Sequence, residues 1–430
     1  MVRRLLFLGA GLSLAAAPLV WTGAPPALAS APPAAPNCPI LPANNVWHAD
    51  VSGLPVNAHS AAWLSSANAG STNLHPDFGS SGDPSAPYGI PWIAVPDSHA
   101  KVTPTFDYAD ESDPGPYPFG PDTPIEGGQQ STGDRHALML DKDACVLYEL
   151  YNANWNGGRP TAGSGAVFNL NSNALRPATW TSADAAGLPI LPGLLRLDEV
   201  QSGHVGHAIR FTVQRTDKSF IWPARHQAGS ASDANLPPMG ARFRLRGDFN
   251  MAGYRPDTQV VLRAMQHYGL IVADNGSNWY FQGEAINNWD DGFIADLKRV
   301  PASAFEAVDE SSLMIDPNSG EYRGGPAPAS PAPGLGTTAT HATPKAPPRG
   351  AGTPLPAVAT TTTTTVADTT TSVFGPLPTP DVQKSPQSGE VALGTPHSSH
   401  GVSGWAPWVA GGLLLGAGGA LFWGWRWRRA

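Results

Sequence analysis

The sequence is poor in charge and in cysteine. Only 14% of its 430 residues are charged, compared with roughly a quarter in an average soluble protein, and the net charge is -8. This balance lacks the basic surface that nucleic-acid binding requires, so we expect no nucleic-acid partner. Glycine and proline, by contrast, number 47 and 45. Their abundance excludes a long helical or coiled-coil protein and favours a loop-rich β domain with disordered flanking segments.

The standard catalytic motifs are also missing. The chain has no GxSxG elbow, no P-loop, no HExxH, no Rossmann glycine pattern and no CxxC pair. Any chemistry must therefore be carried by polar side chains that stand where a β domain normally has apolar ones. We accordingly expect no cofactor, apart from the metal ion considered below.

Both ends of the chain carry membrane signals. Residues 1–29 have the features of a signal peptide, with Arg3 and Arg4 before an apolar stretch and the small-residue cleavage site Ala27-Leu28-Ala29 at its end. Residues 405–427 are apolar and rich in tryptophan, which predicts a transmembrane helix, and the basic end of the chain, residues 428–430, then lies in the cytoplasm. We therefore predict a single-pass protein of the cell membrane whose N-terminal domain is extracellular.

The segment before this anchor has a composition of its own. Residues 318–404 consist mainly of Pro, Ala, Thr, Gly and Ser with hardly an aromatic residue. Such a segment cannot bury enough apolar surface to fold, so we predict a disordered, proline-stiffened stalk. Residues 30–317 remain as a single β-rich extracellular domain.

Cys38 and Cys145 are the only two cysteines. In an exported chain an even number of cysteines favours pairing, so we predict a disulfide between them. Two cysteines are too few for a structural zinc site. The bond would tie the first segment of the domain to its centre.

Strand patterns dominate residues 30–317. We predict a strand pair over residues 135–141 and 144–151, with His136 opposite Glu149, and a second pair over 207–213 and 220–226. One helix is expected over 256–268, because apolar residues recur there at helical spacing, and a buried strand follows at 270–273. The predicted fold is mainly β, a β-sandwich or jelly-roll with a few peripheral helices.

Glu149 is the most informative polar residue. It lies in a strand whose two faces are both largely apolar, so burial should raise its pKa and suit it to proton donation near neutral pH. The alternative is a structural ion pair with His136. Asp274 or Asp198 would supply the second carboxylate of a hydrolytic pair.

Three histidines suggest a different chemistry. His204, His207 and His226 stand near Asp198 and Glu199, and this combination has the ligand types of a metal site. Ordinary surface or hydrogen-bonded histidines are the alternative, because residues three apart in a strand point to opposite faces.

The loop after the predicted strand 270–273 combines groups that bind sugars. Asp274, Asn275 and Asn278 offer hydrogen bonds to hydroxyl groups, and Trp279 offers a flat apolar surface. The alternative is an Asx turn that ends the strand. Further aromatic surfaces for a glycan are expected at Trp155 and Trp180.

Two stretches carry a family resemblance. Residues 172–193, with the sequence SNALRPATWTSADAAGLPILPG, and residues 269–279, with the sequence GLIVADNGSNW, resemble segments of secreted bacterial proteins of no assigned activity. The resemblance covers roughly residues 38–309. It implies that the extracellular domain is one unit, and it transfers no functional residue.

Three hypotheses for function follow. The first is a surface hydrolase that cleaves a cell-wall or environmental glycan with paired carboxylates, of which Glu149 is the general acid. The second is a non-catalytic module that binds such glycans or mediates adhesion. The third is a metal-dependent hydrolase that uses the three histidines. A sandwich fold alone does not decide among them.

Overall fold

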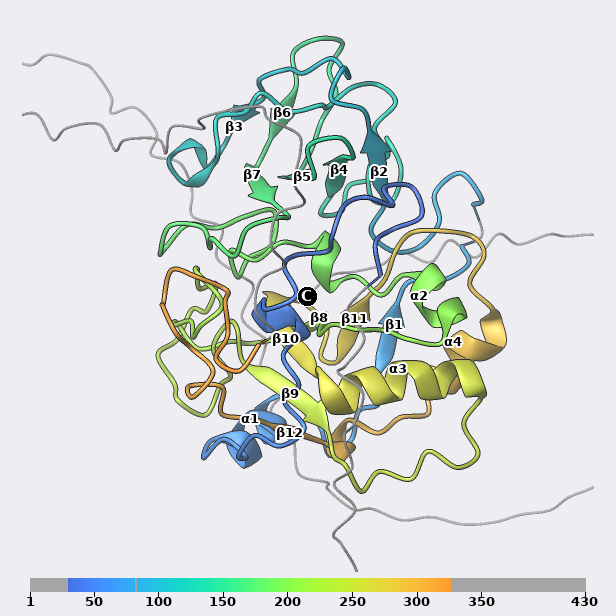
Figure 1. Cartoon of the computed structure of the whole chain (residues 1–430), viewed down its shortest axis with the longest axis vertical. Helices are drawn as coiled ribbons and strands as arrows, with labels where there is room; N and C mark the ends of the chain where they lie inside the picture. Colours follow the sequence, from blue (N-terminus) through green and yellow to red (C-terminus); the bar gives the residue numbers. More distant parts are fainter. Residues whose placement is uncertain (1–29, 82, 326–430) are drawn as a thin grey trace, which may run out of the picture. The chain divides into compact units, whose positions relative to one another are not determined.

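The computed structural model describes residues 30–81 and 83–325 (Figure 1). This part of the chain is a mixed α/β structure that is rich in β-strand, with one curled six-stranded sheet, a four-stranded sheet and few helices. The β-rich character with few helices is confirmed. A jelly-roll is built from antiparallel strands, whereas both larger sheets here contain parallel neighbours, so that part of the expectation is wrong.

The six-stranded sheet has the order β1-β11-β8-β10-β9-β12. Its central strands β8 and β10 are parallel, and their neighbours β11 and β9 run antiparallel to them. The strand bounds are β1 His75–Asp77, β8 Ile209–Val213, β9 Arg242–Leu245, β10 Leu270–Asn275, β11 Tyr280–Gln282 and β12 Phe305–Ala307.

The four-stranded sheet has the order β2-β4-β5-β7, and a two-stranded sheet pairs β3 with β6. Both occupy the upper part of Figure 1, whereas the six-stranded sheet occupies the lower part. The strand bounds are β2 Trp92–Val95, β3 Thr105–Phe106, β4 Ala137–Asp141, β5 Val146–Tyr151, β6 Thr161–Ala162 and β7 Ser164–Asn169.

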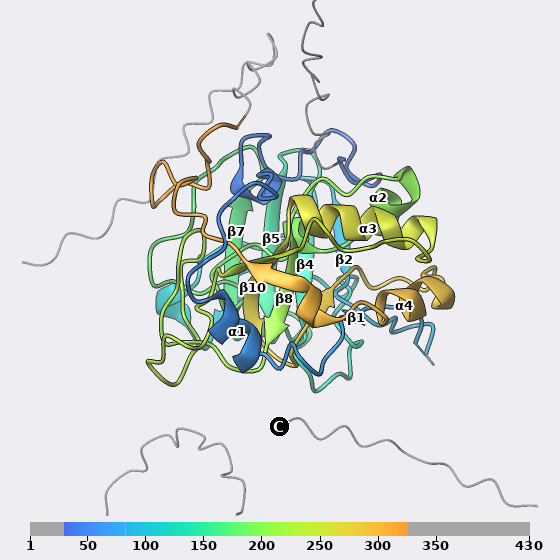
Figure 2. The ribbon, with the colours of Figure 1, turned by 90° about the horizontal axis from the view of Figure 1, so that it is seen from below.

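Helices surround the six-stranded sheet. They are α1 Ser60–Ser66, α2 Leu197–Ser202, α3 Pro256–His267 and α4 Asp291–Leu297, with short 3₁₀ turns at Val46–His48, Ala109–Glu111, Leu191–Gly193 and Ala302–Ala304. Helix α3 confirms the predicted helix and contacts β9, α2 and α4. Figure 2 shows α2 and α3 side by side along one flank of the molecule.

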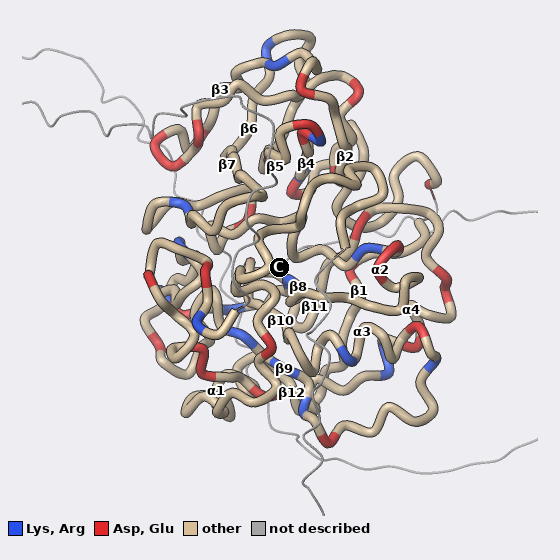
Figure 3. The backbone as a smooth tube through the Cα atoms, in the orientation of Figure 1, with Lys and Arg blue, Asp and Glu red and all other residues tan. Residues whose placement is uncertain are grey.

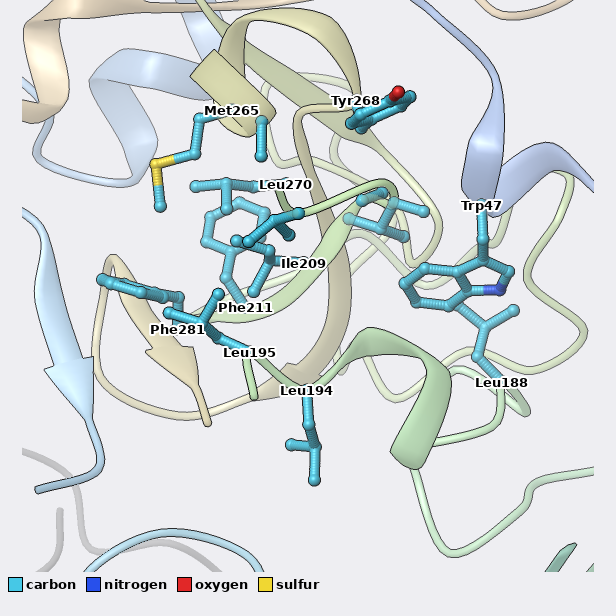
Figure 4. Close-up of a cluster of buried hydrophobic side chains, with 14 of the residues drawn as sticks. Trp47, Leu188, Leu194, Leu195, Ile209, Phe211, Met265, Tyr268, Leu270 and Phe281 are labelled. Carbon is cyan, nitrogen blue, oxygen red and sulfur yellow. The ribbon is translucent and has the colours of Figure 1, made fainter. Parts of the chain in front are cut away.

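Part of the main hydrophobic core lies on one face of the six-stranded sheet, and the same cluster includes Leu138 and Leu147 of the four-stranded sheet. Phe211 of β8 and Phe281 of β11 are directly paired and fully buried. Figure 4 shows them with Ile209, Leu270 and Met265 in one cluster, to which α3 contributes Met265. Because side chains alternate along a strand, the residues on either side of Phe211 and Phe281 must point to the opposite face.

The first predicted strand pair is present, but its register differs by two residues. Glu149 pairs with Leu138 rather than with His136. The reason is the loop: Cys145 has φ 54° and belongs to the turn, while the Asp141 carboxylate accepts hydrogen bonds from the backbone N–H groups of residues 143 and 144. The strand therefore begins at Val146 and not at residue 144.

The second predicted strand pair is wrong. Strand β8 pairs with β10 and β11, and residues 220–226 form no strand. Pro223 lies in the middle of that segment and cannot donate a hydrogen bond to a neighbouring strand. The predicted strand at 270–273 is confirmed and extends to Asn275.

The disulfide between Cys38 and Cys145 is present. Residues 318–325, expected to begin the stalk, instead belong to the folded body. Glu321 bridges to Asn45, Ser319 bridges to Ala174, and the Arg225 guanidinium donates to the Asn318 side chain at 2.8 Å. In the range 30–325 no helix is long and apolar enough to cross a membrane. The predicted signal peptide, most of the predicted stalk and the predicted anchor lie outside the described residues.

Candidate active site

Polar residues occupy the face of the six-stranded sheet that points away from the core. In one row across four strands His75 pairs with Tyr280, Tyr280 with Thr212, and Thr212 with Asp274. A second row begins with Asp77 beside Gln282, and the Gln282 amide donates to the Asp77 carboxylate at 3.2 Å. We call these six residues, together with Arg210, the polar face.

A β-bulge places Asp274 in its row. The register between β8 and β10 shifts after Val272, so Asp274 rather than Ala273 stands beside Thr212. Without the bulge Asp274 would stand beside Val213 and point to the core side of the sheet, the side of Phe211. Bulges commonly redirect a side chain at functional sites. The sequence offered no sign of this bulge, because the strand pattern is uniformly apolar up to residue 273.

Arg210 is the centre of charge on the polar face. It is only 2% exposed, and its Nε donates to the Oδ2 of the fully buried Asp184 at 3.1 Å. The positive charge of Arg210 also acts on Asp274 and Glu126. A single buried guanidinium thus faces three carboxyl groups from different parts of the chain.

His136 and Glu126 approach this cluster from the other sheet. The His136 ring bonds through Nδ1 to the Glu126 carboxylate at 2.7 Å and through Nε2 to the Ala183 carbonyl at 3.1 Å. Both partners only accept hydrogen bonds, so both ring nitrogens donate and the ring is cationic. Burial opposes this charge, but Glu126 outweighs it and raises the pKa of His136 to about 9. We call Asp184, Arg210, Asp274, Glu126 and His136 the charged cluster.

The pKa values of two carboxyl groups in the charged cluster are shifted in opposite directions. Burial, followed by the negative charge of Asp184, raises the pKa of the half-buried Asp274 to about 7. Burial also disfavours the charged form of Glu126, but the neighbouring His136 cation outweighs that effect and holds the pKa of Glu126 below its usual range. The Glu126 side chain is 27% exposed. At neutral pH the charged cluster therefore contains one protonated and one ionised carboxyl group, and general acid–base catalysis requires such a difference in protonation state.

Figure 3 shows acidic and basic residues scattered along the described chain rather than gathered in one long basic segment. The charged cluster combines three carboxyl groups with two basic side chains. Loops border the site. A side chain at Gly128 would meet Ala86 at 3.4 Å, so the segments 125–131 and 83–88 are neighbours, and the Tyr88 hydroxyl donates to Asp77.

Glu149 is not placed for catalysis. Its side chain is fully buried, and its carboxylate accepts hydrogen bonds at 2.9 Å from the backbone N–H groups of Ile190 and Leu191. It therefore fastens β5 to the start of the 3₁₀ turn Leu191–Gly193. Burial raises the pKa of Glu149 to about 7 despite these bonds, as predicted. The role expected for it as general acid is wrong, because both oxygens face backbone donors and no opening reaches them. The expected ion pair with His136 is also replaced, since His136 pairs with Glu126.

Asp198 lies in a different group of charges. Its carboxylate accepts from the Arg196 guanidinium at 3.0 Å at the start of α2. It is therefore not the second carboxylate of a pair with Glu149 or Asp274. Asp274 remains the one residue of the three expected carboxylates that lies in the charged cluster.

The predicted sugar-binding loop is largely structural. Trp279 is fully buried, and its indole N–H donates to the Ala67 carbonyl at 2.8 Å. The Asn278 side chain accepts from the Gln214 backbone at 2.7 Å, and Asn275 bonds to Thr216. The expectation that Trp279 would present a flat surface to a ligand is wrong, because its ring lies in the core. The next residue, Tyr280, is the aromatic residue on the polar face.

Trp155 and Trp180, the other two tryptophans that were expected to bind a glycan, are half-buried. Trp155 packs edge-on against Phe119 with ring centroids 5.6 Å apart. The Arg176 guanidinium lies 5.6 Å from the centroid of the Trp180 ring. Both rings therefore have protein partners, and their role as glycan surfaces stays a prediction.

The three histidines do not form a metal centre. His207 is buried and bonded to the Glu199 carboxylate at 3.1 Å, whereas the His226 ring donates to the Ala185 carbonyl at 2.8 Å. His204 instead lines a surface cavity of about 310 Å³ beside α3. Among residues 30–81 and 83–325 no three His, Cys, Asp or Glu side chains are grouped so that they could hold a metal ion.

Arg210, Asp184 and Glu126 were not predicted as site residues from the sequence. One signal was present: Arg210 stands between Ile209 and Phe211 in an otherwise apolar strand. A charged residue in such a position requires a buried partner, and this requirement would have directed attention to Asp184. Glu126 and Asp184 lie in loops, where local pattern carries no such information.

Comparison with known proteins gives no match. No protein-family model fits the chain, and neither the curated proteins nor the solved structures include one with significant similarity. The site therefore has to be interpreted from its own geometry and charge.

Proposed function

We propose that this protein is an exported, membrane-anchored hydrolase that cleaves a cell-wall or environmental glycan with paired carboxyl groups. The observation that carries the proposal is the charged cluster, where the pKa of Asp274 is raised to about 7 while Glu126 is held ionised. Two carboxyl groups with opposed protonation states are the minimum machinery for glycoside hydrolysis. The sequence-predicted signal peptide and anchor place this machinery where polysaccharides are the accessible polymers.

Asp274 is proposed as the general acid. Its carboxyl group retains its proton up to about pH 7 and is half-buried, so it can donate to the oxygen of a glycosidic bond as that bond breaks. Glu126 is proposed as the second carboxylate. It either activates water or attacks the sugar directly, depending on its separation from Asp274 once a substrate is bound.

The remaining members of the charged cluster position these two. His136 holds the Glu126 carboxylate from one side at 2.7 Å. Asp184 orients Arg210, and its negative charge contributes to the raised pKa of Asp274. Both are buried and already hydrogen-bonded, which suits a supporting role rather than contact with substrate.

A second candidate function is glycan binding without hydrolysis. The half-buried rings of His75 and Tyr280 favour it, because aromatic rings beside hydrogen-bonding groups are suited to sugars whether or not a bond is cleaved. The two functions differ in one observable, the release of product.

The test is a hydrolysis screen with the purified full-length protein in detergent. Release of reducing ends is measured on a panel of neutral and acidic polysaccharides for the wild type, Asp274→Asn and Glu149→Gln. We expect Asp274→Asn to lose about 100-fold or more of the activity, because general acid catalysis contributes about 10²–10⁴-fold. Glu149→Gln should stay within a few-fold of the wild type.

The variant Glu149→Gln is the matched control, since it also neutralises a carboxyl group with a raised pKa. Full activity of Asp274→Asn would refute its role as the acid. Hydrolysis of no member of the panel, together with retention of a glycan by the protein, would favour the binding function.

A further inference from the structure

An aromatic group stands at one end of the polar face. The rings of His75 and Tyr280 are stacked with centroids 3.9 Å apart and planes within 10°, and both residues are half-buried. Tyr88 lies beside them, is 39% exposed and bonds through its hydroxyl to Asp77. Tyr88 also lines a cavity of about 320 Å³ next to α4, so the Tyr88 end of the group borders open space.

The His75 ring is uncharged at neutral pH. Burial, reinforced by the positive charge of Lys298, lowers its pKa to about 4. The pair His75–Tyr280 therefore presents a neutral aromatic surface and does not attract anions as a cationic imidazole would. The half-buried Asp77 carboxylate lies in the adjacent row, where the buried Gln282 amide donates to it, and it offers a hydrogen-bond acceptor to hydroxyl groups.

The strand register fixes the position of this group relative to Asp274. Asp274, Thr212, Tyr280 and His75 follow one another on the neighbouring strands β10, β8, β11 and β1. Neighbouring strands lie about 4.8 Å apart, so Tyr280 is roughly 10 Å from Asp274 along the row and His75 one strand farther. This separation is comparable to the length of a disaccharide.

We infer that His75, Tyr280 and Tyr88 form a sugar-binding subsite that holds a neutral glycan chain next to the site of cleavage. The inference rests on the proposed function. The apolar face of a sugar ring would lie against the aromatic rings, while its hydroxyl groups bond to Asp77.

The charge of the surroundings defines the class of glycan. With Asp274 protonated, the carboxyl groups of Asp77, Glu126 and Asp184 still outnumber the cations Arg210 and His136, both of which are already paired with carboxylates of the protein. A chain rich in uronic acids would bring several further negative charges, of which Lys298, the cation that acts on His75 and lines the cavity beside Tyr88, can offset only one. Neutral sugars carry no such penalty.

The experiment measures binding separately from cleavage. The full-length protein carrying Asp274→Asn is applied to an array of neutral and uronate-rich oligosaccharides, alone and combined with Tyr280→Ala or His75→Ala. We expect it to bind neutral oligosaccharides, and the second substitution should weaken binding about tenfold. Tyr108→Ala, which removes an exposed tyrosine in the turn before residues 109–111, is the matched control and should leave binding unchanged.

The outcomes separate the two proposals. Equal binding with and without Tyr280→Ala and His75→Ala would overturn the subsite, as would binding confined to uronate-rich chains. If the wild type cleaves a glycan that Asp274→Asn does not bind, the subsite is also refuted while the hydrolase proposal stands. If binding depends on the aromatic group but no wild-type product appears, the subsite stands and the hydrolase proposal fails. Neither binding nor cleavage would refute both.

Discussion

Glu149→Gln is expected to change the stability of the protein in a way that depends on pH. The substitution keeps the shape of the side chain but removes its charge. Burial in the folded state raises the pKa of Glu149 from its ordinary value of 4.5 to about 7. Between these values the folded state keeps the proton and the unfolded state releases it.

The sign follows from this difference. Because the folded pKa is raised, the contribution of the protonated group to stability is fully present below about pH 4.5 and is lost as the pH rises to about 7. At 1.36 kcal/mol per pKa unit, the loss between pH 5 and pH 8 is about 2–3 kcal/mol. Glutamine stays neutral and escapes this loss. It does place an amide N–H near the backbone donors of Ile190 and Leu191, which costs about 1 kcal/mol at every pH.

The assay is urea unfolding of the full-length protein and the variant at pH 5, 6, 7 and 8. The free energy of unfolding of Glu149→Gln, relative to the wild type, should rise by about 2–3 kcal/mol from pH 5 to pH 8. Asp296→Asn is the control. The pKa of the buried Asp296 is lowered, since hydrogen bonds from Arg255 and neighbouring groups outweigh its burial. That carboxylate is ionised in both states across this range, so the difference between the Asp296 variant and the wild type should be constant.

A relative stability of Glu149→Gln that is independent of pH, or that falls as the pH rises, would refute the reasoning. Such a result would mean that the two backbone N–H groups stabilise the carboxylate more than burial destabilises it. Glu149 would then be a conventional ionised cap of the 3₁₀ turn Leu191–Gly193.

Three further changes have defined outcomes. The Cys38–Cys145 bond closes a loop with a sequence separation of 107, so its reduction should lower the free energy of unfolding by up to about 5 kcal/mol. The measurement is denaturant unfolding with and without dithiothreitol, and identical unfolding curves would contradict this expectation. Trp279→Ala should lower the free energy of unfolding by about 3–5 kcal/mol, because the ring is fully buried. Trp180→Ala changes a half-buried ring and should lower it clearly less. Similar unfolding midpoints for the two variants would contradict the placement of Trp279 in the core. Asp274→Asn should raise the unfolding midpoint at pH 8 and leave it nearly unchanged at pH 4, because the raised pKa of Asp274 means that its charged form destabilises the folded state. A lower midpoint of the variant at pH 8 would show that the folded state stabilises the carboxylate instead.

Local sequence patterns were sufficient for elements whose partners are close in the chain. Helix α3 has apolar residues at helical spacing, and β4 and β5 are joined by a four-residue turn. The pairing of β8 with β10 was not predictable in the same way, since about 60 residues separate the two strands and nothing in either one specifies the other. The error in the turn before Val146 arose from Cys145, whose left-handed backbone moved the start of β5.

The candidate site shows the same limit at the level of single residues. The apolar pattern correctly predicted that Glu149 is buried with a raised pKa, but not that backbone N–H groups from residues 190 and 191 satisfy it. Composition suggested an aromatic surface near Asp274. Trp279 has φ 64° just before β11 and is buried, whereas Tyr280, the first residue of β11, lies on the polar face. A shift of one residue in a strand moves a side chain to the opposite face of the sheet.

The central claim is that Asp274 acts as a protonated acid beside an ionised Glu126. The most direct test is the dependence of kcat/KM on pH for the full-length protein, measured on the best substrate from the hydrolysis screen. The account predicts that kcat/KM falls above about pH 7, as Asp274 loses its proton, and that Glu149→Gln leaves this limb of the profile in place. A rate that stays constant or rises from pH 7 to pH 9 would contradict the assignment of Asp274 as the acid.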